Sequence, residues 1–160
     1  MSLERFREAQ NAPVAGFDAA LDELRAGAKR GHWIWYVFPQ IEGLGMSPQS
    51  RRFALRGEAE AAAFLRDAEL RARLLTITRT VIGALRDNRA ASLRALMGSD
   101  IDAKKVVSSL TLFRHVARTL YEREGLDEYR ALAGAADAVL ARAAGEGYPP
   151  CAHTLNRLVK

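Results

Sequence analysis

The sequence has few of the residues that form covalent or metal cross-links. Its 160 residues include one cysteine, Cys151, and three histidines, His32, His115 and His153. A single thiol excludes an internal disulfide and suits a reducing compartment. The histidines are far apart in the sequence and show no metal-ligand spacing with the cysteine. We therefore expect no bound metal and no cofactor, and we interpret the Cys151-x-His153 pair as incidental because no third catalytic group is evident.

Long apolar runs are also missing. No run approaches the roughly 18 residues that a membrane-spanning helix needs. The first ten residues, MSLERFREAQ, contain two glutamates and lack the apolar centre of a signal peptide. These absences predict a cytoplasmic protein without membrane contact.

The charge of the chain is unbalanced but not concentrated. The formal net charge is +5, which raises the question of a polyanionic partner. The basic residues are mostly arginines, however, and they are dispersed through Ala/Leu/Arg/Glu-rich segments without a run of five. This dispersal is typical of solvated helix faces and disfavours nucleic-acid binding.

Phosphate-binding loops are absent, whereas helical periodicity is frequent. The chain contains neither a Gly-x-Gly-x-x-Gly nor a Gly-x-x-x-x-Gly-Lys-Ser/Thr sequence. In the segment from residue 68 to 86, apolar residues recur at helical spacing. A hydrophobic content of 49% over 160 residues is enough for one domain with a core. We predict an all-α fold in which residues 1–160 form a single domain of about seven or eight helices.

The least ordinary stretch is residues 31–47, GHWIWYVFPQIEGLGMS, which contains both tryptophans. By propensity alone its aromatic part, Trp33 to Phe38, suits a β-strand. No partner strand is evident elsewhere, and a single strand cannot satisfy its own backbone hydrogen bonds. We therefore predict a short buried helix that ends before Pro39.

This aromatic stretch has two interpretations. In the first, its rings only fill the core, because aromatic side chains bury the most area. In the second, polar tips also project into a pocket, because buried indole, imidazole and amide groups need partners. The stretch then contributes the polar ends of His32, Trp35 and Gln40. In the following loop, Glu42 is a candidate general base if its carboxylate is desolvated. A solvent-exposed glutamate in a turn is the simpler state.

A second group of polar residues lies on the helix predicted from Asp100 to Arg123. Lys104, Ser108, Thr111 and His115 form one stripe at 100° per residue, which is also what a solvated helix face shows. The hydroxyls differ from the charges, because mid-helix hydroxyls gain nothing from propensity. Beside Lys105, they are suited to binding an anion or a ribose.

The string HWIWYVFPQIEGLGMS, together with SSLTLF at residues 108–113, resembles a family of small proteins of unknown function, some of which carry the label calpastatin-like. That family is in turn distantly similar to the NAD/ADP-ribose-associated domain superfamily. Its members are mostly helical and include proposed N-glycosidases, so the resemblance implies a helical fold and a nucleotide-like ligand related to NAD or ADP-ribose. Near its end the chain departs from the pattern, with residues 149–153, PPCAH, in place of a more acidic loop. Outside the central string, the resemblance is carried by Arg5-Phe6, Ala9-Gln10, Leu21 to Lys29, Phe64-Leu65, and Lys105 with Ser108 to Phe113.

Two hypotheses from different classes follow. One is a small-molecule site, with or without a reaction, that stacks a flat ligand on Trp33 or Trp35 and holds its polar part. The other is a non-catalytic interaction module in which the aromatic stretch is core. If the polar ends of these side chains converge on one cleft, the small-molecule site is favoured. If they scatter or point to solvent, the interaction module is favoured. The candidate ligand-binding residues are His32, Trp35, Gln40, Glu42, Gly43, Gly45, Lys105, Ser108 and Thr111.

Overall fold

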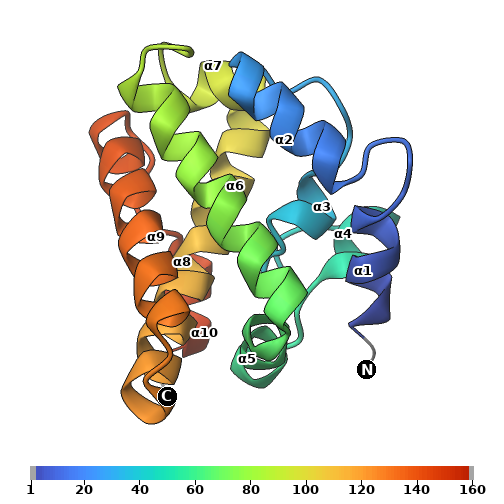
Figure 1. The fold of residues 1–160 in the computed structure, drawn as a ribbon, viewed down its shortest axis with the longest axis vertical. Coiled ribbons are helices and arrows are strands. Elements are labelled where there is room, and N and C mark those ends of the chain that lie inside the picture. Colours follow the sequence, from blue (N-terminus) through green and yellow to red (C-terminus); the bar gives the residue numbers. More distant parts are fainter. Residues whose placement is uncertain (1–2, 159–160) are drawn as a thin grey trace.

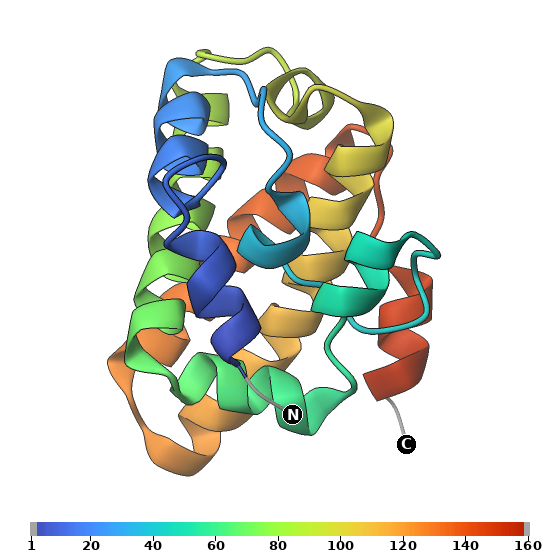
Figure 2. The ribbon, with the colours of Figure 1, turned by 90° about the vertical axis from the view of Figure 1, so that its right-hand side faces the viewer.

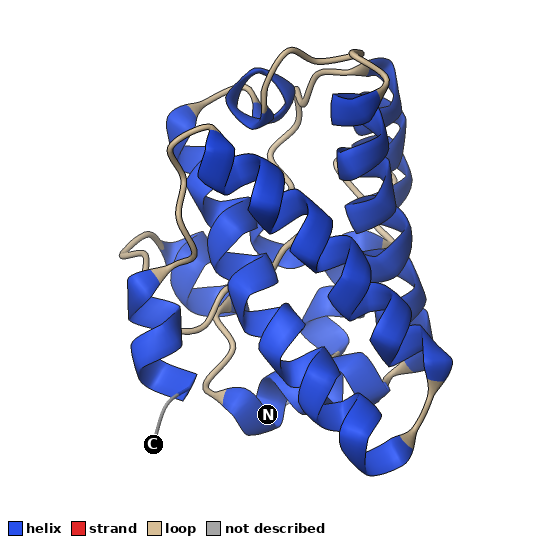
Figure 3. Ribbon diagram, turned by 90° about the vertical axis from the view of Figure 1, so that its left-hand side faces the viewer, coloured by secondary structure: helices blue, strands red, loops and turns tan. Residues whose placement is uncertain are grey.

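The structure, a computed structural model, describes residues 3–158, and every regular element in that range is a helix (Figures 1 and 3). The all-α prediction is therefore confirmed. The count is higher than expected because α3, α4 and α7 have only four to six residues. In order, the helices of the described residues are α1 (Glu4–Gln10), α2 (Phe17–Ala26), α3 (Ile34–Val37), α4 (Pro48–Phe53), α5 (Glu58–Arg66), α6 (Ala68–Arg86), α7 (Leu93–Met97), α8 (Asp100–Glu124), α9 (Asp127–Gly145) and α10 (Ala152–Leu158).

The three longest helices form the frame of the fold. Helix α9 packs against both α6 and α8, and the ribbon shows these three as long rods running most of the length of the molecule (Figure 1). Each of α6 and α8 begins at a side chain that caps its N-terminus, Asp67 for α6 and Ser99 for α8. Helix α8 ends at Gly125, whose φ of 71° is the left-handed conformation that glycine adopts most easily. None of the described helices is both long and apolar enough to span a bilayer.

The short helix predicted in the aromatic stretch is present as α3. Trp33, Phe38 and the residues between them belong to one hydrophobic core, in which Trp35 is only partly buried. The core continues through the rings of Phe6, Phe64 and Phe113, whose centroids are 5.2 Å apart in each successive pair. Helix α3 is thereby held between α1 and α8.

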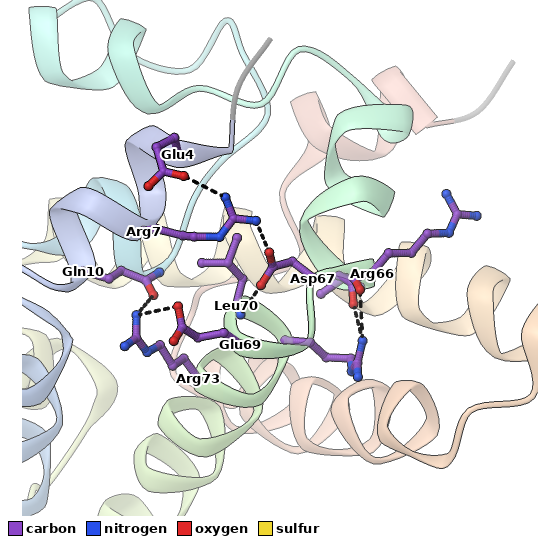
Figure 4. A network of polar contacts seen from close by, with 10 residues as sticks. Glu4, Arg7, Gln10, Arg66, Asp67, Glu69, Leu70 and Arg73 are labelled. Atoms are coloured by element: carbon purple, nitrogen blue, oxygen red, sulfur yellow. Dashed lines mark hydrogen bonds and ion pairs between the residues drawn. The ribbon is translucent and has the colours of Figure 1, made fainter.

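Polar contacts attach α1 to the start of α6 (Figure 4). The guanidinium of Arg7 pairs with the carboxylate of Asp67, and Asp67 also accepts the N–H of Leu70 as the N-cap of α6. Burial alone would raise the pKa of Asp67, but these hydrogen bonds outweigh it and lower that pKa below its ordinary value. The chain ahead of α3 is thus fixed to the helical frame.

After α3 the chain forms a loop that α10 holds in place. The N–H of Glu42 donates to the carbonyl of Leu55 and the N–H of Leu55 donates to the carbonyl of Gln40, both at 2.8 Å. From the other side, His153 and Arg157 of α10 bind the carbonyl oxygen of Glu42 at 3.0 and 3.2 Å. Helix α10 therefore lies beside this loop and α4, as Figure 2 shows at the lower right.

Candidate functional site

Two adjoining cavities lie where the loop after α3 meets the start of α8. The larger has a volume of about 340 Å³ and the smaller about 160 Å³. Gln40 and Leu44 line both, so the two cavities are adjacent. The larger is lined, besides these two, by Ile101, Lys104, Lys105, Val107, Ser108, Pro149 and Cys151.

Lys105 is held at the larger cavity by an aromatic ring. Its Nζ lies 5.1 Å from the ring centroid of Trp35, which is the geometry of a cation–π contact. Its nearest carboxylate oxygen, on Asp102, is 3.9 Å away. The ring therefore fixes the position of the ammonium group without neutralising its charge.

The carboxylate of Asp102 is shared between two lysines. Its other oxygen lies 2.8 Å from Nζ of Lys29, whose side chain is only 7% exposed. Lys29 also donates to the carbonyl of Gly31 at 2.6 Å and lies over the ring of Trp33. The Asp102 carboxylate thus lies between two ammonium groups, and its shorter contact is with the more buried Lys29. A positive charge remains available at Lys105.

Gln40 and Trp35 contribute polar groups without protein partners. Among the hydrogen bonds of the described residues, none involves the side-chain amide of Gln40, although that side chain lines both cavities. Trp35 lines the smaller cavity, and its Nε1 is buried without an acceptor in the part of the chain that the structure describes. A buried N–H without an acceptor is destabilising by about 1–3 kcal/mol. Buried polar groups normally have a partner, so this N–H is a candidate donor to a bound molecule.

Cys151 lies in the wall of the larger cavity, next to Ser108. Its N–H donates to Oγ1 of Thr111 at 3.1 Å, which positions the residue just ahead of α10. Burial raises the pKa of the Cys151 thiol, but the nearby hydroxyl of Ser108 and the backbone N–H groups of Thr154 and His153 stabilise the thiolate and outweigh it. The net effect lowers the pKa below its ordinary value.

Replacing Ser108 by alanine is therefore expected to raise the pKa of Cys151, because the variant loses the hydroxyl that stabilises the thiolate. The rate of alkylation by iodoacetamide should be measured from pH 6 to 10. The pH at which this rate reaches half its maximum should be higher in the variant than in the wild type. Ser109→Ala is the matched control, because Ser109 is equally buried but is not among the groups that lower this pKa. An unchanged profile for Ser108→Ala would contradict the assignment.

The smaller cavity is formed by the loop that the sequence singled out. Glu42, Gly43 and Gly45 all line it. The carboxylate of Glu42 is solvent-exposed and lies 3.3 Å from Arg157, so it is not the desolvated general base that was considered. Both glycines are required by close packing. A Cβ on Gly43, where φ is 98°, would lie 2.9 Å from the ring of His153, and one on Gly45 would lie 2.4 Å from Oγ of Ser50.

Three of the expected contacts are not at the cavities. The side chain of His32, just ahead of α3, is exposed and lines neither cavity. Trp33 is fully buried and hydrogen-bonded to Glu23, so no ligand can stack on it. Thr111 is buried, donates to the carbonyl of Val107 at 2.7 Å and supports Cys151 rather than facing a ligand.

The remaining polar residue of the α8 stripe, His115, is also away from the site. Its Nε2 lies 2.6 Å from Oε1 of Glu58 on α5. Conversely, sequence reasoning missed Arg51, which lines the smaller cavity, and it dismissed Cys151. The proline pair before Cys151 was the available signal, because a residue before a proline is held extended and two prolines in a row mark a loop rather than a helix. Within the described residues, no cluster of His, Cys, Asp or Glu is arranged to hold a metal ion.

Comparison with known proteins gives a family but no activity. A solved structure, the crystal structure of the conserved hypothetical protein Rv1873 from Mycobacterium tuberculosis, is similar with a TM-score of 0.76 and 35% sequence identity. The match covers 99% of this chain and 96% of that one. No curated protein matches significantly. The family described as "Protein of unknown function (DUF1810)" matches residues 1–140, and the chain accordingly belongs to the DUF1810 family.

Proposed function

We propose that this protein binds a small, nucleotide-like molecule that has one flat and one anionic part, in the two adjoining cavities. The observation that carries the proposal is that Gln40, Lys105 and Ser108, from the loop after α3 and from α8, line one cavity of about 340 Å³. A concave, mostly apolar cavity with a few convergent polar groups is the usual form of a small-molecule site.

The anionic part of the ligand is suggested by Lys105. Its ammonium group is fixed over Trp35, and the carboxylate that would neutralise it is held more closely by Lys29. Lys104, at the rim of the same cavity, adds a second cation, which pairs with Asp100 at 3.2 Å. In a partly dry cavity an anion interacts with such a cation more strongly than it does in water.

The flat part is suggested by the walls and the volume of the larger cavity. Leu44, Ile101, Val107 and Pro149 supply apolar surface. An engineered apolar cavity of about 150 Å³ in another protein holds one benzene ring. A cavity of about 340 Å³ therefore has room for a fused bicyclic ring such as a purine. Lys105 covers one face of the Trp35 ring. We therefore expect the flat ring of the ligand to lie between the apolar walls of the cavity and not to stack on that face.

A titration with defined probes tests the proposal. AMP, ADP-ribose and 2-naphthalenesulfonate all combine a flat ring with an anionic group, and a ligand that binds the native state raises the melting temperature by mass action. We expect Lys105→Ala to weaken binding about tenfold or more, the effect of losing a charge-assisted contact. Gln40→Ala should weaken it as well. Both variants should melt close to the wild-type temperature, because neither side chain is in the core.

Arg79→Ala is the control for this experiment, since Arg79 is an exposed cation on α6 that lines neither cavity. It should bind the probes as the wild type does. Binding that is insensitive to both Lys105→Ala and Gln40→Ala, or no binding of any probe, would contradict the proposal.

The second candidate function is that of a non-catalytic interaction module, which exposed apolar residues favour. Ile101, which lines the larger cavity, is 65% exposed, and Met46, in the loop after α3, is 76% exposed. Exposed apolar side chains at the rim of a cleft also occur at protein-binding surfaces. A failure of all small probes combined with a stable fold is the outcome that this second function predicts.

A further inference from the structure

We propose that the smaller cavity is a second anion-binding pocket, centred on Arg51, so that the ligand of this protein carries two anionic groups. One group is held by Lys105 in the larger cavity and the other by Arg51 in the smaller. The inference rests on the proposed function, because it takes the two cavities as compartments of one site.

Arg51 lies on α4 and lines the smaller cavity. Its guanidinium makes no hydrogen bond, ion pair or ring contact with any other described residue. Two neighbouring cations already have partners. Arg52 lies over the ring of Phe53 with a distance of 5.0 Å to its centroid, and Arg157 binds Glu42. Arg51 is therefore the cation at this cavity whose donors are available, and a guanidinium binds carboxylate, phosphate or sulfonate through two parallel hydrogen bonds.

The charge around the smaller cavity favours an anion. Glu42 is the one carboxylate among its lining residues, and this group already pairs with Arg157 at 3.3 Å. The carbonyl oxygen of Glu42 is also occupied, because it accepts from both His153 and Arg157. The charge of the Glu42 carboxylate is thus balanced by Arg157, and no ion pair of Arg51 is present among the described residues.

The wall of the smaller cavity suits a small polar group rather than an apolar one. It includes the amide of Gln40, the hydroxyl-bearing Ser50 and the backbone at Gly43 and Gly45. The glycines keep side chains out of the loop, where an added Cβ would collide with His153 or Ser50. With about 160 Å³, the cavity holds one group of benzene size or less, which includes a phosphate, a sulfonate or a carboxylate.

The shared wall makes the two cavities parts of one ligand site. Gln40 and Leu44 line both, and the Gln40 amide has no protein partner in the described chain. A ligand whose apolar body fills the larger cavity therefore extends past Gln40 into the smaller one. The ligand class is an aromatic body of bicyclic size that carries two anionic substituents.

The test uses three probes that share one ring system and differ in charge: 2-naphthalenesulfonate, naphthalene-1,5-disulfonate and naphthalene-2,6-disulfonate. Their sulfonates stay ionised at every pH used, and the two disulfonates place the second anion at different spacings. Calorimetric titration at constant ionic strength is required, because salt screens such contacts. We expect at least one disulfonate to bind about tenfold more tightly than the monosulfonate, with a stoichiometry of one.

Variants assign that advantage to one residue. Arg51→Ala should remove the disulfonate advantage and leave the affinity for 2-naphthalenesulfonate unchanged, whereas Lys105→Ala should weaken all three probes. Arg51→Glu should make the disulfonate bind more weakly than the monosulfonate. Arg52→Ala, which removes the same charge from the adjacent position, should keep the advantage. Because Arg51 is exposed, these changes should leave the melting temperature near the wild-type value.

The outcomes separate this inference from the proposed function. Suppose that 2-naphthalenesulfonate binds in a way that depends on Lys105. If the second sulfonate then adds no affinity, or if its added affinity survives Arg51→Ala, the proposal of a second anion pocket is wrong and the proposed small-molecule site is retained. If none of the three probes binds, both are wrong.

Discussion

Replacing Trp33 by alanine is expected to lower the free energy of unfolding by about 3–5 kcal/mol, the usual range for deleting a buried aromatic side chain. Trp33 is fully buried, its ring lies 6.5 Å from that of Phe38, and its Nε1 donates to Glu23 at 2.9 Å. The variant therefore loses the packing of the indole ring, and the Glu23 carboxylate loses the hydrogen bond from Nε1. In a chain of this length the melting temperature should fall by roughly 6–20 °C.

Two comparisons make this result informative. Phe38→Ala should destabilise the protein by a similar amount, because Phe38 is equally buried. Trp35→Ala should cost markedly less, because Trp35 is partly exposed at the smaller cavity. Urea unfolding followed by circular dichroism measures all three. Equal stability losses for Trp33→Ala and Trp35→Ala would show that the two neighbouring rings do not differ in burial.

Much of the fold was predictable because its signals are local. The apolar periodicity of α6 and the Ser47-Pro48 start of α4 are set by residues within one or two turns of one another. The short helix α3 was predictable because no other segment offered a partner strand. The start of α2 at Phe17 was less predictable, because it depends on a bend of the chain at residues 13–16 in which Ala15 has a φ of 56°.

The candidate site was only partly predictable because it depends on contacts between distant segments. Gln40, Lys105 and Ser108 were named from residue chemistry, and the structure brings them to one cavity. Arg51 was not named, since nothing in its local sequence distinguishes it from Arg52. The difference arises because Arg52 packs on Phe53 whereas Arg51 faces the cavity. Cys151 was dismissed as incidental, because the contact that places it, with Thr111 of α8, joins residues 40 positions apart in the sequence.

A further large effect is expected at Asp102, whose carboxylate balances Lys29. Asp102→Ala should lower the free energy of unfolding by about 3 kcal/mol or more, because removing one partner leaves the other charge buried and unpaired. The Lys29 side chain is 7% exposed, and without Asp102 its ammonium keeps the carbonyl of Gly31 and the ring of Trp33 as partners. Chemical denaturation at pH 7 measures the loss.

The double variant Lys29→Met/Asp102→Ala separates the unpaired charge from lost packing. Methionine keeps the length and the apolar stem of Lys29, so the double variant should recover most of the stability that Asp102→Ala loses. If it is no more stable than Asp102→Ala, the unpaired ammonium of Lys29 is not the cause of the loss.

Asp102 also links stability to ligand binding, since the same carboxylate lies 3.9 Å from Lys105. Asp102→Asn keeps an acceptor for Lys29 but removes the negative charge, so it should destabilise less than Asp102→Ala. With that charge gone, Lys105 attracts an anion without competition, and 2-naphthalenesulfonate should bind several-fold more tightly to Asp102→Asn than to the wild type. Weaker binding to this variant would mean that Asp102 positions Lys105 for the ligand rather than competing with it.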